Sequence, residues 1–257
     1  MPTAAETELV AAVRLSLVSG VGPLMRQKLL ARFGTPEEVL KAAPSALRDV
    51  EGIGPKISKA ISAATEEVDA EAEIELCREH AIDILVEADP RYPRALKEIH
   101  DPPGILFVKG EIRAADALAI AIVGSRHATH YGLATAERLA ASLSRAGLTI
   151  ISGLARGIDA AAHRGALAAG GRTLAVLGSG LLNIYPPEHA ALALEVAAHG
   201  ALISEAPPYS VPMGGAFPQR NRIISGMSLG NRTPGYKGKW SLSRSHISDP
   251  ACFSCPA

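Results

Sequence analysis

Several short segments after residue 110 combine arginine with glycine, serine or asparagine. All nine basic side chains between residues 111 and 230 are arginines, with no lysine among them. A guanidinium group donates paired hydrogen bonds to phosphate or carboxylate, and glycine lets main-chain N–H groups approach an anion closely. We therefore expect a phosphate-binding site made of Gly124, Ser125, Arg126, Gly153, Arg156, Gly157, Ser179, Arg220, Asn221 and Arg222. A coding bias toward arginine would give the same composition and is the alternative explanation.

The side chains that could catalyse a reaction or hold a cofactor do not form a recognisable set. The segment Gly178-Ser179-Gly180-Leu181-Leu182-Asn183 lacks the third glycine of the dinucleotide-binding fingerprint and follows a later strand than that fingerprint does. His163 lies four residues after Asp159, so this pair could orient an imidazole, or Asp159 could simply stabilise the start of a helix. Cys252 and Cys255 supply only half of a tetrahedral zinc site. The sequence predicts no catalytic residues, no metal and no cofactor.

The spacing of apolar runs predicts the elements that carry the arginine segments. Strand-like runs begin 25 to 30 residues apart, which is the length of a strand–helix unit. The strands are expected at Leu118–Val123, Leu148–Ile151, Thr173–Leu177 and Ala201–Ser204, and the helices at Leu133–Arg145, Asp159–Ala169 and Glu188–Ala198. This alternation predicts an α/β fold with a Rossmann-like, doubly wound, mostly parallel sheet. Ligands of such sheets bind at the carboxyl ends of the strands, where the arginine segments fall, with residues 217–222 expected as a loop.

Residues 1–80 are predicted to form a small all-α domain. The turns Gly20-Val21-Gly22-Pro23 and Gly52-Ile53-Gly54-Pro55 each precede a helical pattern, as in SAM-like or helix-hairpin-helix units. Such hairpins can present main-chain N–H groups to a phosphate. The region holds 9 basic and 13 acidic side chains, a net charge of −4, so weak duplex contact and a purely structural module both remain open.

The overall composition limits the class of protein. The 26 basic and 26 acidic side chains balance, so any contact with a polyanion must come from a local patch. Apolar residues make up 47% of the chain, and three cysteines are too few for a disulfide framework. No apolar run approaches the roughly 18 residues of a membrane span, and the N-terminus has no signal-peptide pattern. We expect a cytoplasmic protein without a membrane partner.

Five longer segments, taken in order, resemble the DNA-processing protein A family, also called DprA or Smf. They are AIAIVGSRHATHYG, IISGLARGIDAAAH, TLAVLGSGLLNIYPPEH, LISEAPP and FPQRNRIISGMSLG, and with the helical front end the resemblance covers about residues 10–230. It implies a protein without enzymatic activity that binds single-stranded DNA, forms a homodimer and assists loading of the RecA recombinase during natural transformation. It also implies that the family's DNA pocket lies at the ten phosphate-site residues named above.

The pattern changes after Gly230, because residues 231–257 show neither strand nor helix periodicity. The expected organisation is a helical domain at 1–80, an incomplete Rossmann-like domain at 81–230 and an atypical, disordered tail at 231–257. We interpret the tail as out of frame, and a native, weakly basic tail is the alternative. A sheet that ends early would leave an unpaired edge and uncover the apolar helix around Ile223–Leu229. We would then expect impaired dimerisation, RecA loading and stability, with a partial DNA pocket retained.

Two other interpretations are compatible with the sequence. One is a Rossmann-like nucleotide phosphoribohydrolase, which would need Glu205 as a catalytic carboxylate, although the PGGxGTxxE string of those enzymes is absent. Release of free base from nucleoside monophosphates would support it. The other is a non-functional gene fragment, and detection of stable protein in cells would argue against it.

Overall fold

The computed structural model describes residues 4–212 and 215–232 and divides the chain into two units. The first unit contains residues 1–92 and 100–106, and the second contains residues 93–99 and 107–257. This division differs from the predicted boundary at residue 80, because the strand that follows the helices is grouped with them. The Tyr92 hydroxyl donates to the Pro103 carbonyl oxygen at 2.7 Å, which ties two parts of the first unit together. Of the predicted tail at 231–257, residues 233–257 lie outside the described residues.

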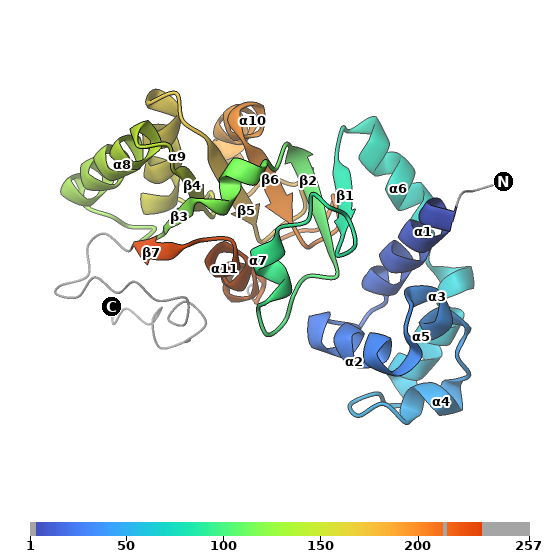
Figure 1. The fold of residues 1–257 in the computed structure, drawn as a ribbon. Coiled ribbons are helices and arrows are strands. Elements are labelled where there is room, and N and C mark those ends of the chain that lie inside the picture. Colours follow the sequence, from blue (N-terminus) through green and yellow to red (C-terminus); the bar gives the residue numbers. More distant parts are fainter. Residues whose placement is uncertain (1–3, 213–214, 233–257) are drawn as a thin grey trace. The chain divides into compact units, whose positions relative to one another are not determined.

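Short helices make up most of the first unit (Figure 1). They are α1 (Ala4–Leu17), α2 (Pro23–Phe33), α3 (Pro36–Lys41), α4 (Pro44–Arg48), α5 (Pro55–Glu67) and α6 (Ala70–Glu79), followed by β1 (Asp83–Val86). Their core contains Leu15, Leu29, Leu47 and Ile61, which are fully buried. The predicted helical region is therefore confirmed.

The two predicted glycine–proline turns each begin a helix. Gly20 and Gly52 both have φ near +93°, a left-handed conformation that glycine adopts without steric cost. The proline that follows each turn occupies the first position of α2 or α5, where a missing N–H costs no helical hydrogen bond. The repeated sequence pattern thus has a local structural reason.

Parallel strands and intervening helices form the second unit. Its elements are α7 (Arg94–Lys97), β2 (Ile105–Gly110, whose first two residues belong to the first unit), η1 (Ala114–Ala117), β3 (Ala119–Ile122), α8 (His130–Arg145), β4 (Thr149–Ser152), α9 (Ile158–Ala168), β5 (Thr173–Leu177), η2 (Pro187–His189), α10 (Ala190–His199), β6 (Ala201–Ser204), α11 (Ala216–Gly226) and β7 (Gly230–Arg232). The strand order is β1-β2-β6-β5-β4-β3-β7. Strands β3 to β7 pair in parallel, whereas β2 pairs antiparallel to β6. The predicted α/β fold with a mostly parallel sheet is confirmed.

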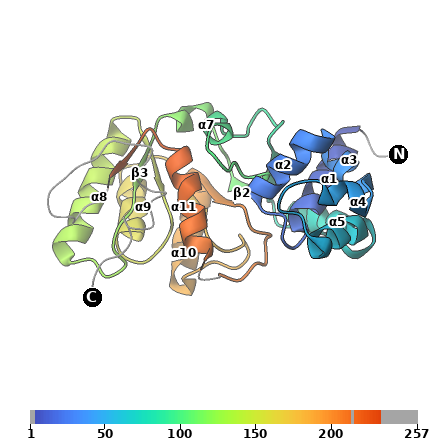
Figure 2. The ribbon, with the colours of Figure 1, turned by 90° about the horizontal axis from the view of Figure 1, so that it is seen from below.

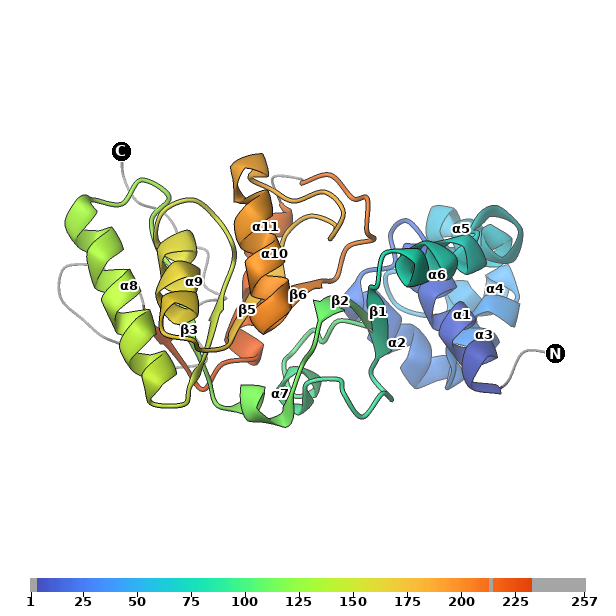
Figure 3. The ribbon, with the colours of Figure 1, turned by 90° about the horizontal axis from the view of Figure 1, so that it is seen from above.

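The helices of the second unit cover both faces of its sheet. Helices α8, α9 and α10 lie together on one face (Figure 3), and α11 and α7 lie on the other (Figure 2). The chain moves from β3 through β4 and β5 to β6 in one direction, and then returns across the sheet to β7 beside β3. Right-handed crossovers in opposite directions place their helices on opposite faces. The strand order therefore reverses between β3 and β7, because the connections on the two sides of this point run in opposite directions along the sheet.

Two predictions for the C-terminal part of the sheet are wrong. Strand β7 pairs with β3, so Gly230 is followed by at least two more strand residues and the edge of β3 is covered. Residues 216–222 begin helix α11 instead of forming a loop, and Ile223, Ile224 and Met227 of this region are buried. Helix α11 packs against β5 on the face opposite α8, α9 and α10, which buries its apolar side.

Among the described residues, no helix is long and apolar enough to cross a membrane.

Candidate nucleic-acid interface

The loops after β3 and β4 contact each other through their main chains. The Ile158 amide donates to the Ser125 carbonyl oxygen at 3.2 Å. Gly157 has φ of +76°, and a Cβ atom there would lie 2.1 Å from that same carbonyl oxygen. A Cβ atom on Gly124 would lie 2.7 Å from the Ile158 side chain. These glycines therefore permit close packing of the two loops, which holds Arg126 and Arg156 at the same end of the sheet.

The loops after β5 and β6 are joined in the same way. The Gly180 amide donates to the Ser210 carbonyl oxygen at 2.9 Å, and the Leu182 amide donates to the Pro208 carbonyl oxygen at 2.8 Å. The Ser204 hydroxyl donates to the Ser179 carbonyl oxygen at 2.8 Å, and Ser179 itself is buried. Ser179 thus supports the loop and does not present its side chain to solvent.

Arg220 is brought to this end of the sheet by the first turns of α11, but its side chain is buried. Its Nη1 donates to the Val176 carbonyl oxygen, and its guanidinium lies against Gly153, where a Cβ atom would be 1.8 Å from Nη1. Only 6% of the residue is exposed, and its Nε has no hydrogen-bond partner within the described parts of the chain. Burial lowers the pKa of Arg220, Asp159 opposes that effect, and the nearby positive charge of Arg126 adds to it.

Asp159 occupies the place where main-chain amides were expected to hold a ligand. Its buried carboxylate accepts from the Gly124 amide at 3.4 Å and also from the amides of Gly153 and Ala155. Burial raises the pKa of Asp159, against the attraction of Arg220 and these amides. The expectation of free amides at Gly124 and Gly153 is therefore wrong, because an internal carboxylate already takes their hydrogen bonds. No local pattern indicates these hydrogen bonds, because an aspartate at this position is equally typical of the start of a helix.

Arg222, the second arginine of α11, is paired with a carboxylate. Its Nη2 donates to the Glu205 carboxylate, which follows β6. The two side chains are 11% and 30% exposed, so this ion pair is largely covered. Asn221 between the two arginines is half-buried. A hydrolase that used Glu205 as its catalytic carboxylate would first have to break this pair.

Arg126 and Arg156 are the two predicted arginines that solvent reaches. Arg126 is exposed directly after β3. The Arg156 Nε donates to the Glu188 Oε1 atom at 2.5 Å, and its guanidinium carbon lies 5.9 Å from the centre of the Tyr185 ring. The Arg156 hydrogen bond lowers the pKa of Glu188, and Glu188 in turn raises the pKa of Arg156. Of the four predicted arginines, Arg126 and Arg156 are exposed, Arg220 is buried and Arg222 is partly covered.

His163 does not form a catalytic pair with Asp159. Its Nδ1 lies 2.7 Å from the Thr173 hydroxyl oxygen, and that hydroxyl donates to the Ile150 carbonyl oxygen, so Nδ1 must carry the hydrogen. Burial lowers the pKa of His163 to about 3. The neutral, fully buried imidazole of His163 is therefore part of the packed core of the second unit. Within residues 4–212 and 215–232, no group of three or more His, Cys, Asp or Glu side chains could hold a metal ion, and Cys252 and Cys255 lie beyond them.

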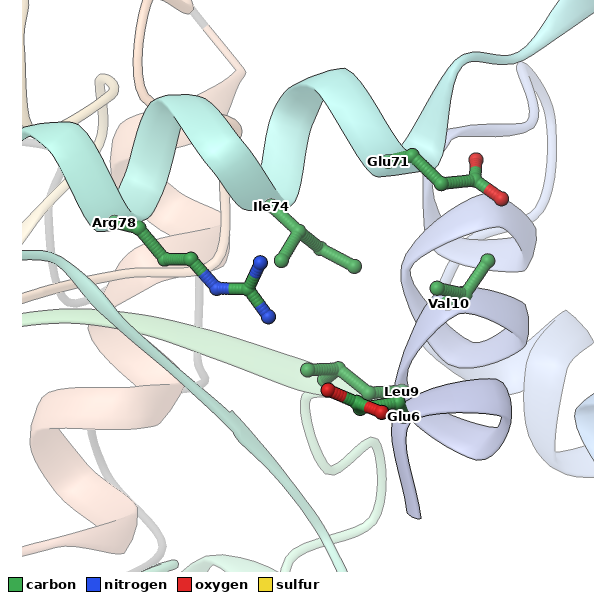
Figure 4. Close-up of a pocket in the computed structure, with 6 residues that line it drawn as sticks. All are labelled: Glu6, Leu9, Val10, Glu71, Ile74 and Arg78. Carbon is green, nitrogen blue, oxygen red and sulfur yellow. The ribbon is translucent and has the colours of Figure 1, made fainter. Parts of the chain in front are cut away.

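A separate hollow lies in the first unit between α1 and α6 (Figure 4). Ile74 and Arg78 of α6 project toward the α1 side, where Leu9 and Glu6 lie. The remaining lining residues are Val10 and Glu71. One arginine beside two carboxylates does not suit a polyanion, so the rim of the second unit is the better candidate interface.

Comparison with known families gives two matches along the chain. The family model described as DNA recombination-mediator protein A matches residues 83–231. A model of the SAM-like helix-hairpin-helix tandem matches residues 13–67. A relative named protein Smf, from Synechocystis sp., is 40% identical over 217 residues, which are 83% of this chain and 54% of that protein. The chain thus spans about half the length of this relative.

Two solved structures are similar to the chain. The structure of DNA processing protein A from Streptococcus pneumoniae has a TM-score of 0.75 and 30% sequence identity, covering 93% of this chain and 81% of that one. A structure of DNA processing protein A from Helicobacter pylori, described for its single-stranded DNA binding mode, has a TM-score of 0.55 and 30% identity. It covers 65% of this chain and 74% of that one.

Proposed function

The chain belongs to the DNA recombination-mediator protein A family, and from this premise we propose that it binds single-stranded DNA along the rim that carries Arg126 and Arg156. The observation that carries the proposal is that these two exposed arginines follow β3 and β4 on loops whose main chains contact each other. In open α/β sheets, ligands bind where the strand order reverses, and here that point lies between β3 and β7. Arg126 directly follows β3.

The exposed and the buried arginines have different parts in this proposal. Arg126 and Arg156 contact phosphates, since paired N–H donors match phosphate oxygens. Arg220 and Arg222 hold the loops in place through the Val176 carbonyl oxygen and the Glu205 carboxylate. Contacts to phosphates carry no base code, so sequence preference should be slight. No bond of the DNA is broken, and we assign the chain no catalytic role.

We extend the proposal to two partners of the longer family members. A protein that holds single-stranded DNA through its phosphates leaves the bases accessible, which suits delivery to the RecA recombinase. The family description as a recombination mediator supports this role. A homodimer would place two such rims on one strand. Sedimentation of the chain with and without oligonucleotide tests the dimer, and RecA filament formation on labelled DNA tests the delivery.

Salt-dependent DNA binding tests the central proposal. Fluorescence anisotropy with labelled single-stranded and double-stranded oligonucleotides across a KCl series gives affinity and salt slope. Each phosphate contact to a single strand adds about 0.7 to the slope, so Arg126→Ala with Arg156→Ala should lower it by about 1.4. The matched control is Arg145→Ala, which removes an exposed arginine in the last turn of α8, at the opposite end of the sheet. An unchanged slope in the folded double variant would remove the proposed rim.

A further inference from the structure

One of the two exposed arginines already holds an internal anion. Arg156, in the loop after β4, and Glu188, in η2, approach to 2.5 Å, and their side chains are 49% and 50% exposed. A carboxylate and a phosphate present similar oxygen pairs to a guanidinium. Glu188 therefore occupies the position that a DNA phosphate would take on Arg156.

This ion pair differs in its access to water from the pair that Arg222 forms with Glu205. Arg222 and Glu205 are mostly covered, and the Arg220 guanidinium is buried against the Val176 carbonyl oxygen, so both arginines stay in place as parts of the fold. Exposed ion pairs are weak and open readily, because water solvates both partners. Of the two pairs, Arg156–Glu188 is the one that a ligand from solvent can exchange.

Arg156 keeps a second contact when Glu188 leaves. Its guanidinium carbon lies 5.9 Å from the centre of the Tyr185 ring, within reach of a cation–π interaction. Tyr185 thus holds the guanidinium at the rim whether its anion is Glu188 or a phosphate. The exchange needs only the movement of the Glu188 side chain.

We propose that Glu188 limits the affinity for single-stranded DNA by competing with phosphate for Arg156. This inference rests on the proposed DNA-binding function. Since exposed ion pairs contribute little, the effect of removing the carboxylate is modest, and Glu188→Gln should tighten binding about 1.5- to 5-fold.

The experiment compares four variants by anisotropy with labelled oligo-dT at 0.1 M KCl. Glu188→Gln and Glu188→Ala remove the carboxylate, and the second guards against an unexpected contact of the new amide. Glu195→Gln is the matched control, because it makes the same charge change at an exposed position further along α10. Glu188→Gln combined with Arg156→Ala tests whether Glu188 acts through Arg156.

Competition predicts that both Glu188 variants bind more tightly than Glu195→Gln, and that this gain disappears when Arg156 is absent. If Glu188→Gln and Glu195→Gln gain equally, only the general charge changed and the inference is overturned. A gain that persists without Arg156 overturns it as well. Absence of binding by the wild-type chain would instead refute the proposed function itself.

Discussion

Replacing Asp159 with asparagine should destabilise the second unit strongly. The substitution keeps the shape and one oxygen acceptor for the amides of Gly124, Gly153 and Ala155, but it leaves the Arg220 charge buried without a counter-ion. Leaving a buried charge uncompensated costs about 3–5 kcal/mol. With a urea slope of about 2 kcal/mol/M, the unfolding midpoint should fall by about 2 M.

A second substitution distinguishes this reasoning from simple damage to the core. Burial raises the pKa of Asp159 and lowers that of Arg220, so the fold disfavours both charges. Combining Asp159→Asn with Arg220→Met removes both and should recover most of the loss, as replacement of buried pairs by apolar groups often does. Urea unfolding followed by far-UV circular dichroism measures all variants. A double variant less stable than Asp159→Asn would refute the argument.

Two further predictions concern the same end of the second unit. Because His163 has a folded pKa of about 3, below its unfolded value near 6.5, its contribution is complete above pH 6.5 and is lost as pH falls. Stability should drop by about 2 kcal/mol from pH 7 to pH 5, and His163→Asn should flatten this dependence in urea titrations. Gly157→Ala should cost about 1–3 kcal/mol more than Gly170→Ala, since both have positive φ but only at Gly157 would Cβ meet a carbonyl oxygen, at 2.1 Å. Equal thermal shifts for the two glycine variants would contradict the assigned packing.

Local patterns in the sequence were sufficient for most of the fold. The apolar runs predicted Thr173–Leu177 and Ala201–Ser204 with their observed bounds, because buried parallel strands need continuous apolar residues. The start of α11 was misassigned as a loop. The arginine and asparagine residues in its first turns interrupt the apolar pattern that would predict a helix. Their burial depends on partners from distant parts of the chain.

The short strand β7 was missed for a related reason. Residues 230–232 carry no strand pattern of their own, and their assignment depends on pairing with β3, which lies more than a hundred positions earlier. Non-local hydrogen bonds of this kind stabilise a strand without requiring a local propensity.

The sequence alone determined the residue types of the rim and their place after the strands, because parallel strands bring their carboxyl ends to one edge whatever the packing details. Only the tertiary structure decided which arginines face solvent. Arg220 and Arg222 match Arg126 and Arg156 in type, yet Arg220 is buried against Val176 and Arg222 is largely covered beside Glu205, whereas Arg156 meets Glu188 in the open. These pairings join loops far apart along the chain. The net charge and the solvent exposure of a site depend on such neighbours, and the amino-acid sequence alone does not show which residues become neighbours in the fold.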